Sequence, residues 1–325
     1  MEPAFPLFRL PKNVIIEVIK NLPLKQLFKF SLVSSETKNL VSSLGLEASD
    51  VDIRIWRTII VTVNIGRNSL SLTFYNDSND PNVLLPVDIN IPVAASCDYE
   101  GTRLQSFTPF NFSNWLNHIN TVFSCTLPPD VFFARPGARF EIESLRNTIR
   151  NVNCLIVFAD VTNTCSKKVL KSFNAPSELF LHRSPFEDTC QIQQIFIQNF
   201  EKISFDDVYT LDDMLSINTE IVSFTHTISQ KQFNQFLKHW IRGSNPRLQD
   251  MSLSIHKTDV VSGKVYLNGI GFMEMSEETK REIRENYYRP IYVDMIQIRR
   301  NDGTPAVIAT EDSANFLRIH FVVLH

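Results

Sequence analysis

The first forty or so residues of the chain contain three consecutive helical patterns, and this feature most constrains how the chain can fold. Pro11 and Pro23 each stand where a helix begins, because proline lacks the N–H that has no partner there. Ser34 or Ser35 is predicted to cap a third helix. Apolar residues recur at steps of three and four along all three segments, which indicates one buried face on each helix. Such a unit carries more apolar surface than it can hide alone, so both a docking module and the start of a larger core fit the pattern.

After about residue 50 the period of the apolar residues changes from helical spacing to strict alternation. Apolar side chains alternate with polar ones over 53–65 and again over 70–74, on either side of Gly66, which predicts a β-hairpin. Another alternating run, at Val87, Ile89 and Ile91, ends at Pro92 and predicts a further strand. This region therefore indicates a small antiparallel sheet.

The rest of the chain predicts two helices, then alternating strands and helices, and finally a set of antiparallel strands. Ser113 is predicted to cap the first helix, and the second covers about 142–149. The strand-like cores start roughly 19 to 29 residues apart, which is typical of leucine-rich-repeat-like units, although a mixed α/β sheet also fits. These cores lie at 154–158, 179–181, 203–205, 222–224 and 251–255. Alternation over 295–323 around the turn at Gly303 predicts a terminal antiparallel meander.

Composition narrows the class of protein and its compartment. Hydrophobic residues make up 43% and charged residues 21% of the 325 residues, as in ordinary folded proteins. A formal net charge of −3 gives no indication of nucleic-acid binding. The five cysteines are odd in number and no two have a C-x-x-C spacing, so neither a set of disulfides nor a zinc site is indicated. Neither a signal peptide nor an apolar run long enough to span a membrane is evident. We therefore expect a cytoplasmic or nuclear protein with no membrane partner.

The sequence shows no convincing active site, so we expect a protein that is not an enzyme and that needs no metal or cofactor. Acidic pairs at 206–207 and 212–213 raise the question of a cation site. However, Thr210 followed by Asp213 is also typical of a helix start, where acidic side chains are favoured. The seven histidines have no metal-ligand spacing, and Gly269 and Gly271 lack the further residues of a phosphate loop.

The N-terminal residues resemble an F-box over its whole length. Leu10-Pro11 at the start, the middle helix, and Leu32-Val33-Ser34 match that family's pattern in order and spacing. The resemblance implies that these helices dock on the Skp-type adaptor of a cullin–RING ubiquitin ligase, with some of the residues packing inside the module instead. The adaptor-binding residues implied in this way are Leu10, Pro11, Val14, Ile15, Val18, Leu22, Leu27 and Phe28.

A second resemblance covers about residues 199–255. The segments Leu211–Asn218 and Phe236–Leu248 resemble the type 2 F-box-associated domain of nematode F-box proteins. That resemblance implies a C-terminal domain that selects protein substrates, without identifying any of them. The predicted domains are the F-box at 1–48, the antiparallel β region at 49–110, and a leucine-rich-repeat-like substrate-binding domain at 111–325. The fold class expected is therefore α+β or α/β, with a three-helix F-box, irregular strand–helix units and a C-terminal β meander.

In a strand–helix unit the helices cover one face of the sheet, so alternate side chains of each strand lie on the open face. We expect this face to bind the substrate, with Phe180 as its aromatic anchor. A shift of one residue in any strand would exchange the two faces. The predicted open-face residues are Phe180, His182, Ser204, Asp206, Ser223, Thr225, Ser252 and Ser254.

The function that fits best is the substrate-recognition subunit of an SCF-type ubiquitin ligase, which binds a Skp-type adaptor, through it a cullin, and an unknown protein substrate. A protein that binds or sequesters its target without a ligase, such as an antidote to a toxic protein, is the alternative. A hydrolase or transferase in the α/β region is a third class, which a cluster of Cys, His and Asp in a deep pocket would favour.

Overall fold

The structure of the protein, a computed structural model, describes residues 7–76, 86–97, 102–104, 108–134, 139–173, 176–256, 264–286 and 294–324. The contacts within the chain divide it into two compact units, Met1–Pro176 and Ser177–His325, which we describe separately. Helices and strands alternate through both units, so the predicted mixed α and β class is confirmed. The three domains predicted from sequence motifs stay a prediction.

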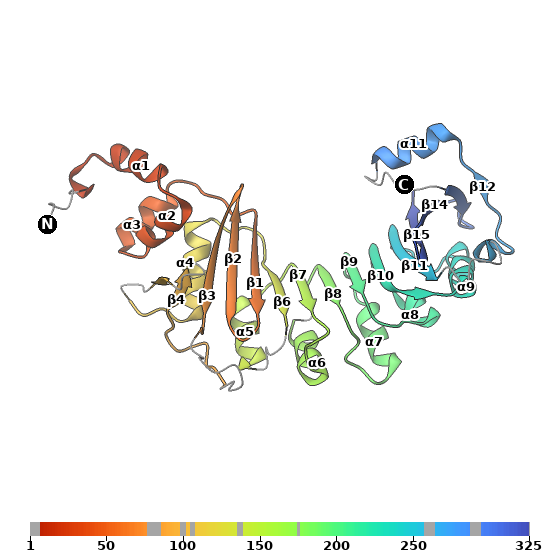
Figure 1. The fold of residues 1–325 in the computed structure, drawn as a ribbon, viewed down its shortest axis with the longest axis horizontal. Coiled ribbons are helices and arrows are strands. Elements are labelled where there is room, and N and C mark those ends of the chain that lie inside the picture. The colour runs from red at the N-terminus through yellow and green to blue at the C-terminus, as the bar shows by residue number, and fades with distance from the viewer. Residues whose placement is uncertain are drawn as a thin grey trace. The chain divides into compact units, whose positions relative to one another are not determined.

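Unit 1 contains the three N-terminal helices and a mixed sheet (Figure 1). Its sheet has the strand order β7-β6-β1-β2-β3-β4-β5, in which β7, β6 and β1 are parallel and the others antiparallel. The helices are η1 (Leu7–Arg9), α1 (Lys12–Lys20), α2 (Leu24–Ser31), α3 (Ser35–Ser42), α4 (Phe112–Val122), α5 (Ile142–Ile149) and α6 (Asn163–Ser172). The strands are β1 (Asp50–Ile55), β2 (Ile59–Ile65), β3 (Asn68–Phe74), β4 (Ala95–Cys97), β5 (Thr102–Leu104), β6 (Asp130–Phe133) and β7 (Cys154–Val157).

Unit 2 has four parallel strands joined by helices, followed by an antiparallel meander whose last strand pairs with β11. The strand order is β8-β9-β10-β11-β15-β14-β13-β12. The strands are β8 (Glu178–Leu181), β9 (Lys202–Phe205), β10 (Ile221–Ile228), β11 (Asp250–His256), β12 (Met273–Glu274), β13 (Asp294–Arg299), β14 (Pro305–Asp312) and β15 (Phe316–Val323). The helices are α7 (Thr189–Phe196), α8 (Leu211–Ser216), α9 (Gln230–Ile241), η3 (Val265–Leu267) and α11 (Glu277–Asn286).

Most predicted elements are present, and two details of the prediction are wrong. The alternating run at 87–91 is not a strand: Val87 makes a single bridge to Phe140, and the chain then turns. The side chain of Asp88 accepts a hydrogen bond from the backbone N–H of Asn90 at 2.9 Å, and this local bond competes with strand pairing. Helix α4 begins two residues earlier than predicted, because Asn111 rather than Ser113 caps it. Whether the strand–helix units belong to the leucine-rich-repeat class stays a prediction.

The N-terminal helices are packed against the rest of unit 1 through α2. Phe28 is fully buried, and its ring lies 5.8 Å from that of Phe123 and 6.4 Å from that of Trp115. Helix α2 also contacts β3, and α3 contacts α4. The apolar surface on this side of the helices is therefore covered by the protein's own α4, as the larger-core interpretation expects.

A buried hydrogen bond joins the same two helices. The hydroxyl of Ser31 donates to the carbonyl of Phe28 at 2.7 Å, so its oxygen is left to accept from Nε2–H of His118, 2.8 Å away. Both side chains are almost completely buried. Burial lowers the pKa of His118 to about 4, with a smaller contribution from the positive charge of Lys38. His118 is therefore a neutral hydrogen-bond donor at physiological pH.

This bond predicts a specific loss of stability in acid. A base whose pKa is lower in the folded state than in the unfolded state resists protonation only while folded, so stability falls as the pH drops below the unfolded value of about 6.5. We expect His118 to contribute a loss of about 2 kcal/mol in the free energy of unfolding between roughly pH 7.5 and pH 5. Urea unfolding of the wild type and of His118→Gln, followed by tryptophan fluorescence at both pH values, measures this contribution as the difference between their pH dependences. Equal pH dependence of the two proteins would contradict it.

Candidate functional site

The first candidate surface is the outer side of the N-terminal helices, where apolar side chains remain open to solvent. Val14 and Val18 lie one turn apart on α1 and are 39% and 45% exposed. Phe8 is 51% exposed and stacks on Phe30, with 6.4 Å between the ring centroids. Val33, between α2 and α3, is also exposed. Several large apolar side chains exposed within one segment of about forty residues are typical of a protein-binding site.

The structure separates the eight residues predicted to bind an adaptor. Ile15, Leu27 and Phe28 are buried in the free chain and pack inside the protein. Leu10 and Leu22 are half-buried, whereas Pro11, Val14 and Val18 are exposed. Only the last five present surface that a partner can reach without rearrangement, and the binding role of all eight stays a prediction. Phe8 and Val33 are exposed and Phe30 is half-buried in the same module, and the sequence pattern did not indicate a binding role for these three residues.

The second candidate surface is the open face of the parallel strands in unit 2. Every residue predicted to point inward from β8 to β11 is buried, so the predicted assignment of the two faces is confirmed. The buried residues are Leu179, Leu181, Ile203, Phe205, Val222, Phe224, Met251, Leu253 and Ile255. Phe180, Ser204, Ser223 and Ser252 are register partners across four neighbouring strands and form a single row on the other face.

Three of the remaining predicted residues form a hydrogen-bonded chain beside this row. Asp206 follows the end of β9, and its Oδ2 lies 2.5 Å from Nδ1 of His182. Its Oδ1 accepts a bond of 2.6 Å from the hydroxyl of Thr225. Ser254 does not join them, because the register of β10 shifts between Ser223 and Thr227. A β-bulge of this kind redirects side chains locally, and the alternation of the sequence gives no sign of it.

Phe180, the predicted aromatic anchor, is half-buried. The ammonium of Lys202 lies 4.8 Å from the centre of its ring and 3.3 Å from the carboxylate of Glu178. A cation held over an aromatic face is attracted to it, so a partner that reaches the ring must displace the lysine or include it in the contact. Ser223 and Ser252 are joined by a 3.1 Å bond between their hydroxyl groups.

Helix α11 borders this open face, and the sequence analysis did not predict it. Ser252, His320, Ala309 and Met295 are register partners on successive strands, so they share one face of the sheet. Ala309 and Met295 lie in a buried cluster with Met275, Val307 and Ile283. Of these, Ile283 belongs to α11. On the other face, α9 packs on β15, with the ring of Trp240 4.9 Å from that of Phe321. Figure 1 shows α7 to α9 on one side of this sheet and α11 on the other.

The acidic residues raised as a cation site act instead in helix capping and local hydrogen bonds. Asp213 Oδ2 accepts from the backbone N–H and the hydroxyl of Thr210, at 2.8 Å each, at the start of α8. Asp207 accepts from the backbone N–H groups of Ser184 and Val208. Within the described ranges, no group of three or more His, Cys, Asp or Glu side chains is arranged to hold a metal ion. No helix in the described part of the chain is long and apolar enough to cross a membrane.

Two segments of the chain match models of known protein families. A model of the F-box domain matches residues 7–48, and a model described as F-box associated matches residues 191–253. The F-box associated domain-containing protein sdz-33 of Caenorhabditis elegans is 24% identical over 306 residues, which cover 93% of this chain and 92% of that protein. The chain therefore matches the F-box family over its N-terminal helices and the F-box-associated family over part of unit 2. No solved structure matches it.

These matches fall on both candidate surfaces of the chain. The F-box, residues 7–48, holds all of the exposed apolar residues of the first surface. The F-box-associated match runs from within α7 to within β11, and it includes Ser204, Asp206, Ser223, Thr225 and Ser252 of the open face. Phe180, His182 and Ser254 lie outside it.

The hydrogen-bonded chain on the open face can be tested by its effect on stability. Asp206→Ala removes the acceptor that His182 and Thr225 share, and because all three side chains are partly solvated we expect a loss of about 1 kcal/mol in the free energy of unfolding. Ser254→Ala is the matched control, since this half-buried side chain has no hydrogen bond in the described structure, and we expect a change within about 0.5 kcal/mol. Urea denaturation measures both, and equal losses would show that the chain of bonds does not stabilise this face.

Proposed function

We propose that this protein is the substrate-recognition subunit of an SCF-type ubiquitin ligase. The observation that carries the proposal is the exposure of four apolar side chains in the F-box, Phe8, Val14, Val18 and Val33. It lies on the part of the chain that matches the F-box family, on residues that the packing of unit 1 leaves uncovered. A Skp-type adaptor, and through it a cullin, is the partner that this surface would bind.

The electrostatic character of the F-box supports a charged component in that contact. Residues 7–48 contain six Lys and Arg residues and three Glu residues, against a net charge of −3 for the whole chain. A basic module on an acidic protein favours a partner surface that is acidic around an apolar centre. Association that depends on exposed charges weakens as the salt concentration rises, because ions screen them.

The open face of unit 2 is the surface proposed to hold the target protein. Its residues are mostly polar and half-exposed, and several are fixed by hydrogen bonds to one another. Fixed polar groups lose little side-chain entropy when a partner binds, and they discriminate between partners through the pairing that each one requires. The eight residues predicted for this face, including Ser254 beyond the bulge, remain the candidates for substrate contact.

In this proposal the protein has no transfer chemistry of its own. It increases the rate of ubiquitin transfer by holding the target close to the enzymes of the complex, because an encounter between tethered molecules is intramolecular and its effective concentration is high. Neither a cofactor nor a nucleic acid has a part in this mechanism. A cytoplasmic or nuclear location is the one in which such a complex would act.

The alternative, a protein that sequesters its target without a ligase, uses the same two domains. Deleting residues 1–45 is a poor way to distinguish the two functions. It would also remove Phe28 and uncover Trp115 and Phe123 in the core of unit 1, so a loss of function would follow from unfolding alone. Substitutions of exposed F-box residues avoid this difficulty.

The decisive variants are Val14→Glu and Val18→Glu, combined in one protein. Both side chains are exposed in the free chain, so we expect little change in stability, whereas two buried carboxylates at the contact would weaken adaptor binding more than tenfold. Pull-down of a purified Skp-type adaptor at equal protein concentration, with the midpoint of thermal unfolding recorded for each protein, measures both effects.

Leu127→Glu is the matched control, because Leu127 is an exposed apolar residue of the same unit and lies outside the F-box. We expect it to bind the adaptor like the wild type. If the wild type recovers no adaptor, or if the double variant recovers as much as the control, the ligase proposal is wrong. Target binding that survives in the double variant, together with loss of target degradation in cells, would separate the ligase function from sequestration.

A further inference from the structure

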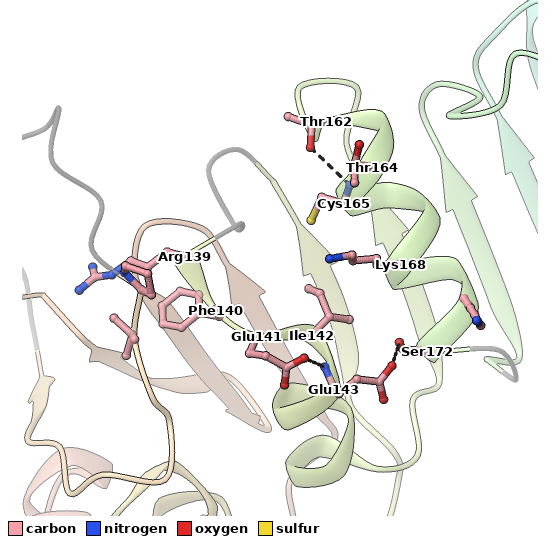
Figure 2. A pocket seen from close by; sticks show the side chains of 13 residues that line it. Arg139, Phe140, Glu141, Ile142, Glu143, Thr162, Thr164, Cys165, Lys168 and Ser172 are labelled. Atoms are coloured by element: carbon pink, nitrogen blue, oxygen red, sulfur yellow. Dashed lines mark hydrogen bonds between the residues drawn. The ribbon is translucent and has the colours of Figure 1, made fainter.

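A pocket of about 580 Å³ lies in unit 1 between the start of α5 and one face of α6. Neither the F-box nor the open face of unit 2 includes it. Figure 2 shows Cys165 and Lys168 projecting from α6 toward the segment that carries Phe140, Glu141 and Ile142. The volume is within the usual range for sites that bind small molecules or short peptide segments.

The inner wall of the pocket is apolar. Val87 and Phe140, which pair through the isolated bridge, form one side, and Ile142 lies at the start of α5. The thiol of Cys165 forms part of the opposite side, and burial raises its pKa, so it stays uncharged near neutral pH. An apolar side chain of a ligand would be removed from water here.

The two carboxylates at the rim are already engaged within the protein. Glu141 caps α5 and accepts from the backbone N–H groups of Glu143 and Ser144 at 3.0 and 2.5 Å. The hydrogen bonds from Ser144 hold the pKa of Glu141 below its usual range, so this group remains ionised. Glu143 accepts a bond of 2.7 Å from the hydroxyl of Ser172. Both acidic groups therefore stabilise the walls of the pocket.

Of the basic residues that line the pocket, Arg139 donates to the backbone carbonyls of Arg57 and Tyr75, whereas the two lysines are not engaged in this way. Across the described ranges, neither Lys168 nor Lys171 makes a salt bridge or a side-chain hydrogen bond, and both are exposed. Lys168 points into the space between α6 and Ile142 (Figure 2). The charge of Lys168 contributes to lowering the pKa of Glu141, but its ammonium makes no hydrogen bond or salt bridge in the described structure. An ammonium in this position beside an apolar wall is complementary to a ligand that has a negative group next to an apolar one.

We propose that this pocket binds a peptide segment of a partner protein that carries a carboxylate beside an apolar side chain, as a chain terminus ending in leucine or phenylalanine does. The apolar side chain lies against Val87, Phe140 and Ile142, and the carboxylate pairs with Lys168. This inference rests on the proposed function to the extent that the partner is a target protein. It gives the target a second attachment point, in the unit that contains the F-box.

The test uses the full chain and acetylated dipeptides ending in leucine, phenylalanine or valine, each as the free acid and as the amide, in isothermal titration calorimetry. We expect at least one free acid to bind. Its amide should bind at least about fivefold more weakly, since the amide lacks the charge that pairs with Lys168. Lys168→Ala should weaken the binding of the free acid by a similar factor. Lys167→Ala, which removes the neighbouring exposed lysine outside the pocket, should leave affinity within about twofold.

Three results would overturn the inference. The first is that no free acid binds at millimolar concentration, and the second is that acid and amide bind equally. The third is that octanoate binds more tightly than every peptide, which would assign the pocket to a lipid-like acid. Pull-down of the adaptor with Lys168→Glu distinguishes this inference from the proposed function, because the adaptor should bind this variant as it binds the wild type.

Discussion

The burial of Phe28 against α4 is the contact on which the arrangement of the N-terminal part depends. A three-helix module of about forty residues is too small to form a sufficient core by itself. Here α2 supplies an aromatic ring to a cluster that already includes Trp115 and Phe123, and Ser31 adds a buried hydrogen bond to His118. The F-box and the strands of unit 1 therefore share one core, and the F-box is not a separate unit on a flexible linker.

This shared core explains why some apolar side chains of the F-box are buried and others are exposed to solvent. Ile15, Leu27 and Phe28 are covered by the protein itself, whereas Val14 and Val18 on the same stretch of sequence are left in water. Each exposed valine that a partner covers would stabilise the complex by roughly 1 kcal/mol or more. The inner side thus fixes the position of the module, and the outer side is the part that remains available to an adaptor.

The sequence predicted those features that depend on a regular period. Alternation placed Leu179 and Ile203 inward and Phe180 and Ser204 outward, because one face of each strand is buried and the period of two leaves a single consistent choice. It did not predict the bulge in β10, which separates Ser254 from Thr225, since an inserted pair of residues leaves no mark on the composition. It also mistook Val87 and its neighbours for a strand, because the turn made by Asp88 is a local hydrogen bond that hydrophobicity does not reveal. Within the F-box, one helical stripe gave no means of dividing Val14 from Ile15, since only the packing of the folded chain buries one of them and exposes the other.

The open face of unit 2 can be selective because other parts of the unit provide its stability. The buried side of the parallel strands packs under the connecting helices, and Trp240 on Phe321 continues that core to the meander. On the face that carries the polar row, helix α11 covers only the part of the sheet that contains Met295 and Ala309. This part lies next to His320, where the row ends. The strands from β8 to β11 are therefore free to present polar side chains outward at little cost to folding. Since His182, Asp206 and Thr225 already hold one another in place, a partner meets a fixed pattern of donors and acceptors, and it binds well only if its own polar groups match that pattern.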